Sequence, residues 1–217
     1  MPRLTLDVPD DPRAWALVGR LRELGATPLA ARRTLVTGGA RSGKSSYAES
    51  LFTGEAQVDY VATSARNDDD PEWMARIAAH VARRPASWRT LETLDIAGVL
   101  GVPGNPVLVD CLGVWLTRIL DDTDFWTDPA GAGELVDRRV DELARAIAAT
   151  PRRVVLVTNE VGSGVVPGTE SGRGFRDRIG ILNARIADAC DELVLCVAGR
   201  AVSLPRPDTD ARKESVR

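Results

Sequence analysis

The sequence predicts one α/β domain in which a mainly parallel β-sheet is covered by helices. Short apolar runs alternate along the chain with segments of helical pattern. A glycine-rich motif stands between the first of these runs and a helical segment. A chain of 217 residues with 44% hydrophobic content is long enough to bury one core of this kind.

The glycine-rich motif is GGARSGKS, residues 38–45, which matches G-x-x-x-x-G-K-[ST]. Its glycines let backbone N–H groups face phosphate oxygens, Lys44 supplies a cation, and the Ser45 hydroxyl can ligate Mg²⁺. A chance glycine-rich turn is the alternative, but a strand at 34–37 and a helix at 45–52 give the order that phosphate binding needs. We therefore expect phosphate contacts from the whole motif: Gly38, Gly39, Ala40, Arg41, Ser42, Gly43, Lys44 and Ser45.

The remaining elements follow from apolar runs and helical periodicity. We expect further strands at 58–63, 106–110, 153–158 and 193–198, helices at 112–120, 133–149 and 175–189, and an exposed polar loop at 121–133. These place the domain at 34–200. Before it, residues 1–33 form an extension that we expect to be helical, because 12–24 is amphipathic. After it, residues 201–217 are rich in charge and proline, and we expect a mobile tail.

Composition limits the partners and the compartment. The net charge of −3 gives no basic surface for nucleic acid, and no apolar run is long enough to cross a bilayer. The N-terminus has no signal-peptide core, so we expect a cytoplasmic protein. Cys111, Cys190 and Cys196 lack metal-ligand spacing, and we expect buried free thiols.

Two carboxylates follow predicted strands. Asp110 ends the run PVLVD, and ligands gather at the carboxyl ends of strands in open α/β sheets. We expect Asp110 to join Ser45 in holding Mg²⁺; a helix cap before residue 112 is the alternative. Glu160 follows VVLVTN and is a candidate substrate contact, unless it only organises the turn GSGVVPG.

His80 is the only histidine, in the string RIAAHVARRPASWRTLE. A lone histidine is usually structural or exposed. However, imidazole is a good nucleophile towards phosphorus, and the nearby arginines can stabilise charge on a transferring group. The residues alone leave both roles open.

Together these segments resemble the bifunctional adenosylcobinamide kinase/adenosylcobinamide-phosphate guanylyltransferase family, known as CobU or CobP. The resemblance rests on LVTGGARSGKS, YVATS, RIAAH with RRPASWRTLE, VLVDCLGVWLT, VLVTNEVGSGVVP and FRDRIGILNARIADACDEL, in this order over residues 34 to about 200. It implies a RecA-like P-loop fold, a homotrimer, and two reactions. ATP or GTP phosphorylates adenosylcobinamide; then GTP guanylylates an enzyme histidine, which passes GMP to adenosylcobinamide phosphate and so forms adenosylcobinamide-GDP.

The resemblance also implies roles for particular residues. His80 would be the guanylylated residue and Lys44 a second catalytic residue, with Mg²⁺ as the cofactor. Nucleotide contacts beyond the glycine-rich motif would come from Ala62, Thr63, Ser64, Val81, Ala82, Arg83, Arg84, Glu92 and Asp110. Residues 1–33 and the segment after Gly199 have no counterpart in the family pattern.

Two other functions compete with this expectation. A P-loop kinase for a small molecule would transfer only the γ-phosphate and would use His80 structurally. A nucleotide-binding switch would bind nucleotide without turnover of a small substrate. Covalent labelling by GTP separates both from the family's activity.

Overall fold

The computed structural model describes residues 32–64, 78, 81–82 and 84–206. The predicted N-terminal helix, His80 and Arg83 lie outside the described residues. No helix in the described part of the chain is long and apolar enough to span a membrane.

The described residues form a seven-stranded sheet with the order β3-β2-β4-β5-β1-β6-β7. Six strands are parallel, and β7 pairs antiparallel with β6. The strand before the glycine-rich motif, β1, is separated from the strand of Asp110, β4, by β5. The architecture is the mainly parallel α/β sheet that the sequence predicts. The strands are β1 (Arg33–Gly38), β2 (Asp59–Ala62), β3 (Arg89–Glu92), β4 (Val107–Asp110), β5 (Val154–Asn159), β6 (Glu192–Val197) and β7 (Arg200–Leu204).

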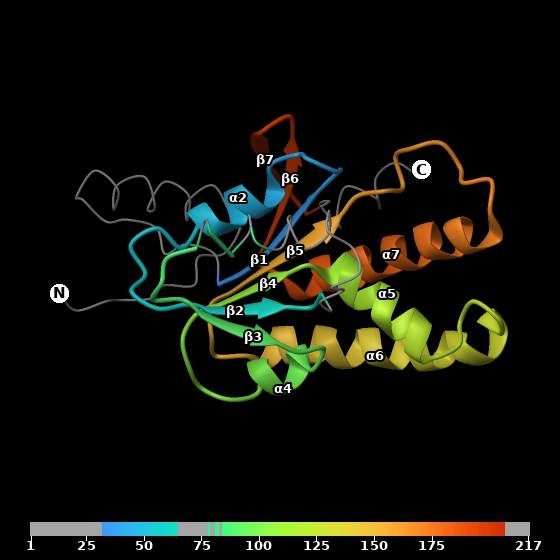
Figure 1. The fold of residues 1–217 in the computed structure, drawn as a ribbon, viewed down its shortest axis with the longest axis horizontal. Coiled ribbons are helices and arrows are strands. Elements are labelled where there is room, and N and C mark those ends of the chain that lie inside the picture. The colour runs from blue at the N-terminus through green and yellow to red at the C-terminus, as the bar shows by residue number, and fades with distance from the viewer. Residues whose placement is uncertain (1–31, 65–77, 79–80, 83, 207–217) are drawn as a thin grey trace, which may run out of the picture.

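Helices cover both faces of the sheet (Figure 1). One face carries four helices and the larger buried cluster, and the other carries α2 and the smaller cluster. The central strands β4 and β5 are buried on both faces, which explains their nearly continuous apolar sequences VLVD and VVLVTN. The helices are α2 (Lys44–Ser50), α4 (Ile96–Leu100), α5 (Leu112–Asp122), α6 (Pro129–Ala149) and α7 (Glu170–Ala189).

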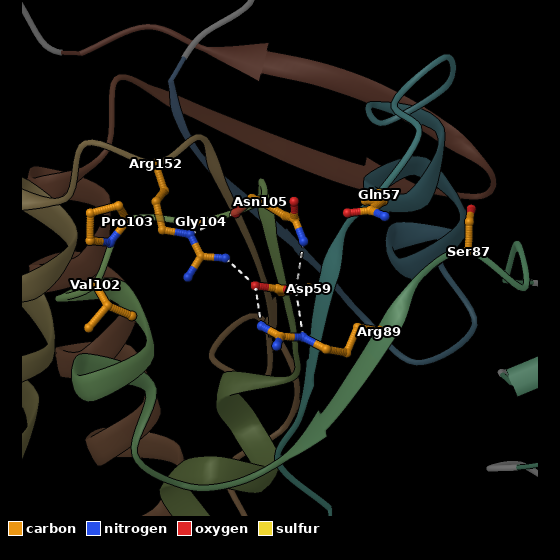
Figure 2. A pocket seen from close by; sticks show the side chains of 9 residues that line it. All are labelled: Gln57, Asp59, Ser87, Arg89, Val102, Pro103, Gly104, Asn105 and Arg152. Atoms are coloured by element: carbon orange, nitrogen blue, oxygen red, sulfur yellow. Dashed lines mark hydrogen bonds and ion pairs between the residues drawn. The ribbon is translucent and has the colours of Figure 1, made fainter.

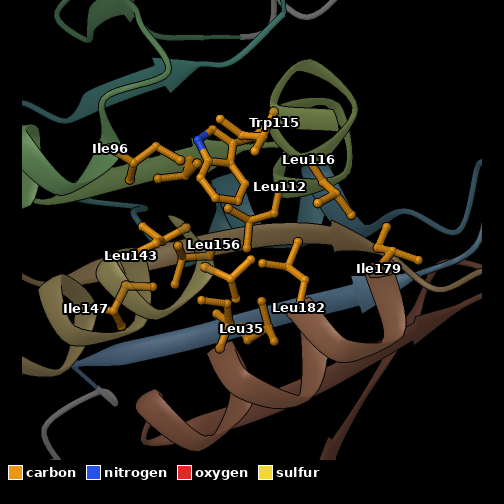
Figure 3. Close-up of a cluster of buried hydrophobic side chains, with 14 of the residues drawn as sticks. Leu35, Ile96, Leu112, Trp115, Leu116, Leu143, Ile147, Leu156, Ile179 and Leu182 are labelled. Atoms are coloured by element: carbon orange, nitrogen blue, oxygen red, sulfur yellow. The ribbon is translucent and has the colours of Figure 1, made fainter. Parts of the chain in front are cut away.

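The larger cluster lies between the strands and helices α5, α6 and α7 (Figure 3). Leu35 and Leu156 project from the sheet against Leu112, Leu143 and Leu182, and all five side chains are fully buried. Each such leucine contributes roughly 1.5–3 kcal/mol relative to an exposed position. This packing fixes the helices relative to the carboxyl ends of the strands.

The structure confirms the predicted fold class and differs from the sequence expectations at several boundaries. The loop predicted at 121–133 is shorter, because α5 continues to Asp122 and α6 already begins at Pro129, where the Asp128 side chain accepts a hydrogen bond from Gly131 N. Helix α7 begins at Glu170 instead of 175, after the similar cap Thr169.

Three elements were not expected from the sequence. Strand β3 has the largely exposed sequence RTLE, and helix α4 is only five residues long, so neither gives a periodic apolar signal. The sequence predicts a mobile tail from residue 201, but residues 201–204 belong to β7. This prediction is wrong for those four residues because their hydrogen bonds to β6 extend the sheet, although the strand is exposed along its length.

Candidate nucleotide-binding site

The strand register brings the predicted site residues to one edge of the sheet. Gly38 at the end of β1 pairs with Asn159, and Ala62 at the end of β2 pairs with both Asp110 and Glu92. Neighbouring strands lie about 4.8 Å apart, so β1 and β4, with β5 between them, are separated by roughly 10 Å. The glycine-rich motif and the carboxylate of Asp110 therefore share the edge at which open α/β sheets bind ligands.

The motif at 38–45 has the backbone of a phosphate-binding loop. Arg41 has a φ of 56° and Gly43 a φ of 91°, both in the left-handed region. A Cβ atom on Gly38 would lie 2.5 Å from the carbonyl oxygen of Cys196, so only glycine fits there. The loop opens directly into the N-terminus of α2, where free N–H groups and the helix dipole favour an anion.

Lys44 and Ser45 begin α2 beside this loop. The Lys44 ammonium donates a hydrogen bond to the carbonyl oxygen of Gly39, 3.1 Å away, and so lies back across the loop. Within the described part of the chain no hydrogen bond engages the Ser45 hydroxyl. The hydroxyl of Ser42 is buried, has no hydrogen-bond partner among the residues that the structure describes, and lies against Gly38.

Ser45 and Asp110 offer oxygen atoms of the kind that Mg²⁺ binds. Mg²⁺ prefers oxygen ligands, usually one or two protein groups together with phosphate oxygens and water. Ser45 offers an unengaged hydroxyl at the loop, and Asp110 offers a half-buried carboxylate on the same edge. The N-cap of α5 is Cys111 and has no side-chain hydrogen bond, so Asp110 does not have the helix-capping role that the sequence left as the alternative.

Tyr60 links two of the predicted site residues. Its hydroxyl donates to Oδ2 of Asp110 at 2.8 Å, and the guanidinium carbon of Arg84 lies 3.2 Å from its ring centroid. Burial, and then the charge of Asp110, raise the pKa of Tyr60 far above its ordinary value, so the hydroxyl remains a proton donor. Tyr60 is the first residue of the motif YVATS, but nothing in the sequence indicates its contacts with Asp110 and Arg84.

The connection after β2 is tied to the start of α5. The hydroxyl of Thr63 donates to the carbonyl oxygen of Cys111 at 2.8 Å and accepts from Cys111 N at 3.2 Å. Thr63 is buried, so its side chain holds the ends of β2 and β4 together. Ala62 and Ser64 flank it and are half-buried.

Glu160 holds the loop that follows β5. Its backbone N–H donates to the carbonyl oxygen of Gly38 at 3.1 Å, and its carboxylate accepts from Ser163 N at 3.1 Å. The side chain of Arg176 on α7 donates to the carbonyl oxygen of Gly162 in the same loop. The structure thus places Glu160 beside the phosphate loop and gives its carboxylate the loop-organising contact that the sequence offered as the alternative.

The segment around the predicted nucleophile is described only in part. Val81 and Ala82 are exposed, and Arg84 stacks on Tyr60 and donates to the Thr90 hydroxyl at 3.3 Å. Glu92 is exposed at the end of β3. Arg84 therefore brings its positive charge close to Asp110, while the positions of His80 and Arg83 remain predictions.

A cavity of about 430 Å³ lies at the opposite edge of the sheet, where strands β2 and β3 begin (Figure 2). The buried pair Asp59 and Arg152 lies beside it, and Asp59 also accepts from Arg89 and from Asn105. The Arg152 guanidinium also donates to the carbonyl oxygens of Asn105 and Val99. Because these buried groups satisfy one another, this cavity is lined by a structural network.

The site combines the phosphate loop, the carboxylate of Asp110 at the end of β4 and the guanidinium of Arg84. Together these groups can bind a nucleoside triphosphate and stabilise charge on a transferring phosphoryl group. Residues 34–204 match the model of the family described as cobinamide kinase / cobinamide phosphate guanyltransferase, CobU. The chain belongs to this family.

Relatives with this description match most of the chain. The protein named bifunctional adenosylcobalamin biosynthesis protein CobU from Salmonella typhimurium is 42% identical over 182 residues, which is 78% of this chain and 98% of that protein. The Escherichia coli protein of the same name is 40% identical over 180 residues. The Pseudomonas aeruginosa bifunctional adenosylcobalamin biosynthesis protein CobP is 42% identical over 81% of this chain and 96% of its own length.

Among solved structures, the P4 protein from bacteriophage phi6 in complex with ADP is similar to this chain, with a TM-score of 0.39 and 17% identity. The likeness covers 79% of this chain and 54% of that chain. The CobU family match runs from residue 34 to residue 204, that is, from the second residue of β1 to the last residue of β7.

Proposed function

We propose that this chain is a bifunctional enzyme of cobalamin biosynthesis. It phosphorylates the aminopropanol hydroxyl of adenosylcobinamide with ATP or GTP, and then transfers GMP from GTP to adenosylcobinamide phosphate. The observation that carries the proposal is the phosphate loop at Gly38–Ser45 facing the same edge as Asp110, in a chain about 40% identical to bifunctional relatives over nearly their whole length.

In the phosphorylation step the acceptor hydroxyl attacks the γ-phosphorus. The new O–P bond forms as the bond to the nucleoside diphosphate breaks, and the hydroxyl loses its proton. The loop amides and Lys44 counter the charge on the phosphate oxygens. Ser45 and Asp110 would hold Mg²⁺, which neutralises part of the triphosphate charge when bound.

In the guanylylation step a nitrogen of His80 attacks the α-phosphorus of GTP. An N–P bond forms while the bond to pyrophosphate breaks, and pyrophosphate leaves. A phosphate oxygen of adenosylcobinamide phosphate then displaces the imidazole, which releases adenosylcobinamide-GDP. The covalent adduct conserves the transfer potential of GTP. Arg83 and Arg84 follow the histidine, and Arg84 brings positive charge to the Tyr60 ring beside Asp110.

The test uses GTP labelled at the α-phosphate with Mg²⁺ and the purified full chain, followed by denaturation and mapping of an acid-labile, base-stable adduct. We expect the label on His80, and none in His80→Ala. Protein that binds GTP but retains no label would favour the kinase that transfers only the γ-phosphate. Binding without any corrinoid-dependent turnover would favour the nucleotide switch.

The two reactions should separate by mutation. His80→Ala should abolish guanylyl transfer and largely spare phosphorylation, because only guanylyl transfer uses the imidazole as a nucleophile. Lys44→Ala should slow both by about a hundredfold or more, since both need charge compensation at the loop. Product analysis with each nucleotide measures the two rates, and equal loss of both in folded His80→Ala would contradict separate roles.

The proposal includes a homotrimer, which is the assembly that the family resemblance implies. Light scattering coupled to size-exclusion chromatography measures the mass directly. A mass of three 23.3 kDa chains would support the trimer, and a single-chain mass would exclude it.

A further inference from the structure

The turn between β6 and β7 contacts the phosphate loop directly. The backbone N–H of Gly199 donates a hydrogen bond to the carbonyl oxygen of Ser42, 2.9 Å away. On the other side of the same peptide, a Cβ atom placed on Gly43 would lie 3.2 Å from the Cα of Gly199. The two backbones are therefore in close contact where the loop turns into α2.

The conformation of this turn is unusual and well defined. Val197 pairs with Arg200, so Ala198 and Gly199 form a two-residue hairpin loop. Their φ angles are 50° and 76°, and positive values at both central positions are the signature of a type I′ turn. Such a turn matches the twist of its two strands, so the β6–β7 ladder determines where Gly199 lies. β6 in turn pairs with β1, the strand that leads into the phosphate loop.

The hydrogen bond determines the direction of one phosphate-loop amide. A trans peptide is planar, and its C=O and N–H point in opposite directions. Because the Ser42 carbonyl is held towards Gly199, the N–H of Gly43 points away from the turn. Phosphate-binding loops work by directing such amides at phosphate oxygens before the ligand arrives.

We propose that the β6–β7 turn is a positioning element for the phosphate loop, and that Gly199 acts through its backbone to hold the Ser42–Gly43 peptide in its phosphate-binding orientation. This inference rests on the proposed nucleotide binding at Gly38–Ser45. Gly199 touches no substrate atom in this role; it is a positioning residue, and its side-chain position is open, with no atom within 4 Å of an added Cβ.

The chain offers a matched control. Gly54 has a φ of 91°, and an added Cβ would also meet nothing within 4 Å. It follows α2 at the opposite end of that helix from the phosphate loop. A valine at either site faces the same backbone strain without a steric clash, so Gly199→Val and Gly54→Val should destabilise the protein comparably. Only Gly199→Val alters a residue whose backbone N–H donates to the phosphate loop.

The experiment measures the dissociation constant of GTP and the urea unfolding midpoint for both variants. We expect Gly199→Val to weaken GTP binding about tenfold, whereas Gly54→Val should stay within about twofold of the unsubstituted protein. Gly199→Asn should recover most of the affinity, because asparagine tolerates the left-handed region. Equal GTP affinities for the two valine variants would overturn the proposal.

Two further measurements keep the outcome decisive. If Gly199→Val does not fold, Gly199→Ala against Gly54→Ala gives the same comparison with a smaller substituent, and equal affinities would again overturn the proposal. If the unsubstituted protein itself does not bind GTP, the proposed function has failed; if it binds and Gly199 variants bind as tightly as Gly54 variants, only the positioning role has failed.

Discussion

At the scale of single residues, Tyr60 is the side chain that links two predicted residues of the site. It contacts Asp110 through its hydroxyl and Arg84 through its ring. A hydroxyl that donates to a carboxylate oxygen fixes the orientation of that carboxylate. The ring meanwhile holds the guanidinium by a cation–π contact worth roughly 0.5–2 kcal/mol.

We predict that Tyr60→Phe separates these two contacts. Phenylalanine keeps the ring under Arg84 and removes only the hydrogen bond to Asp110. The apparent Mg²⁺ requirement of phosphorylation should rise several-fold, because the carboxylate loses the hydrogen bond that Tyr60 donates to Oδ2. Titration of initial rates with Mg²⁺ tests this, and isothermal titration of Mg²⁺ with the nucleotide complex gives a readout independent of turnover. An unchanged Mg²⁺ requirement by both methods would show that Asp110 needs no orientation from Tyr60.

Glu160 offers a second test at this scale. Its carboxylate accepts from Ser163 N, a contact that a glutamine carbonyl can also make. If Glu160 contacts the acceptor substrate through its charge, which is one of the two roles that the sequence leaves open, Glu160→Gln should raise KM for the acceptor several-fold. If it only organises the loop, Glu160→Gln should be kinetically silent while Glu160→Ala loses about 1 kcal/mol of stability. Steady-state kinetics and urea unfolding of the two variants distinguish the roles.

At the scale of elements, helix α7 supports the loop that lies beside the phosphate loop. Arg176 donates to carbonyl oxygens of this loop, and Arg173 donates to the carbonyl oxygens of Pro167 and Gly168. The loop nevertheless exposes Val165 almost completely, at 95%. The loop is therefore held in place mainly by hydrogen bonds from the helix, and burial of its side chains contributes little.

We predict that Arg176→Ala increases hydrogen exchange in residues 161–168 by about tenfold, which corresponds to the loss of roughly 1.4 kcal/mol of local stability. Arg138→Ala is the matched control, because Arg138 is a largely exposed arginine on α6 whose partner is the exposed Glu134. Exchange measured by mass spectrometry should change in the loop for Arg176→Ala alone. Equal exchange in the two variants would mean that the loop does not depend on α7.

The sequence predicted elements well where one residue pattern determined them. Strands β4 and β5 and helix α6 have continuous or periodic apolar residues; the strands are found close to their expected limits, and α6 ends where expected but begins four residues earlier. Strand β3 and turn residue Gly199 gave no such signal, because their roles depend on pairing partners distant in the sequence. The same holds for Tyr60, whose contacts with Asp110 and Arg84 exist only after the sheet forms.

At the scale of the whole molecule, the two edges of the sheet have different tasks. The carboxyl edge carries the phosphate loop and Asp110, whereas the amino edge carries the buried ion pair of Asp59 and Arg152 (Figure 2). Arg152 lies just before β5 and extends its side chain to Asp59. Its guanidinium fits because Gly104 has no side chain: a Cβ added to Gly104 would lie 3.2 Å from the guanidinium carbon. Stability and chemistry can therefore be changed separately.

We predict that Asp59→Asn costs about 3 kcal/mol of unfolding free energy, because the buried charge of Arg152 loses its partner. Arg89→Gln removes the exposed partner of the same carboxylate and should cost no more than about 1 kcal/mol. GTP affinity at 25 °C should be unchanged in both, since the phosphate loop lies at the other edge. Urea unfolding and GTP titration test the pair, and a large loss of affinity in folded Asp59→Asn would contradict the separation of the two edges.

Two aspartates, Asp59 and Asp191, contribute to how stability depends on pH. Burial alone would raise the pKa of Asp59, but hydrogen bonds from Arg89, Arg152 and Asn105 outweigh it and hold the pKa below its usual value. The pKa of Asp191 is lowered in the same way by its hydrogen bonds to Arg33, against burial. A carboxyl group with a lowered pKa in the folded state binds fewer protons there than in the unfolded chain, so its contribution is complete above the unfolded pKa of about 3.9 and is lost as pH falls towards the folded values.

We therefore predict that unfolding free energy is nearly constant from pH 7 to about pH 5 and then falls steeply below about pH 4. Asp59→Asn should already be destabilised at pH 7 and should show a shallower fall, because one of the groups that takes up a proton on unfolding has been removed. Urea unfolding at a series of pH values measures both slopes. An acid slope for Asp59→Asn equal to that of the unsubstituted protein would show that Asp59 has the same pKa in the folded and unfolded chain, which would contradict its burial against Arg152.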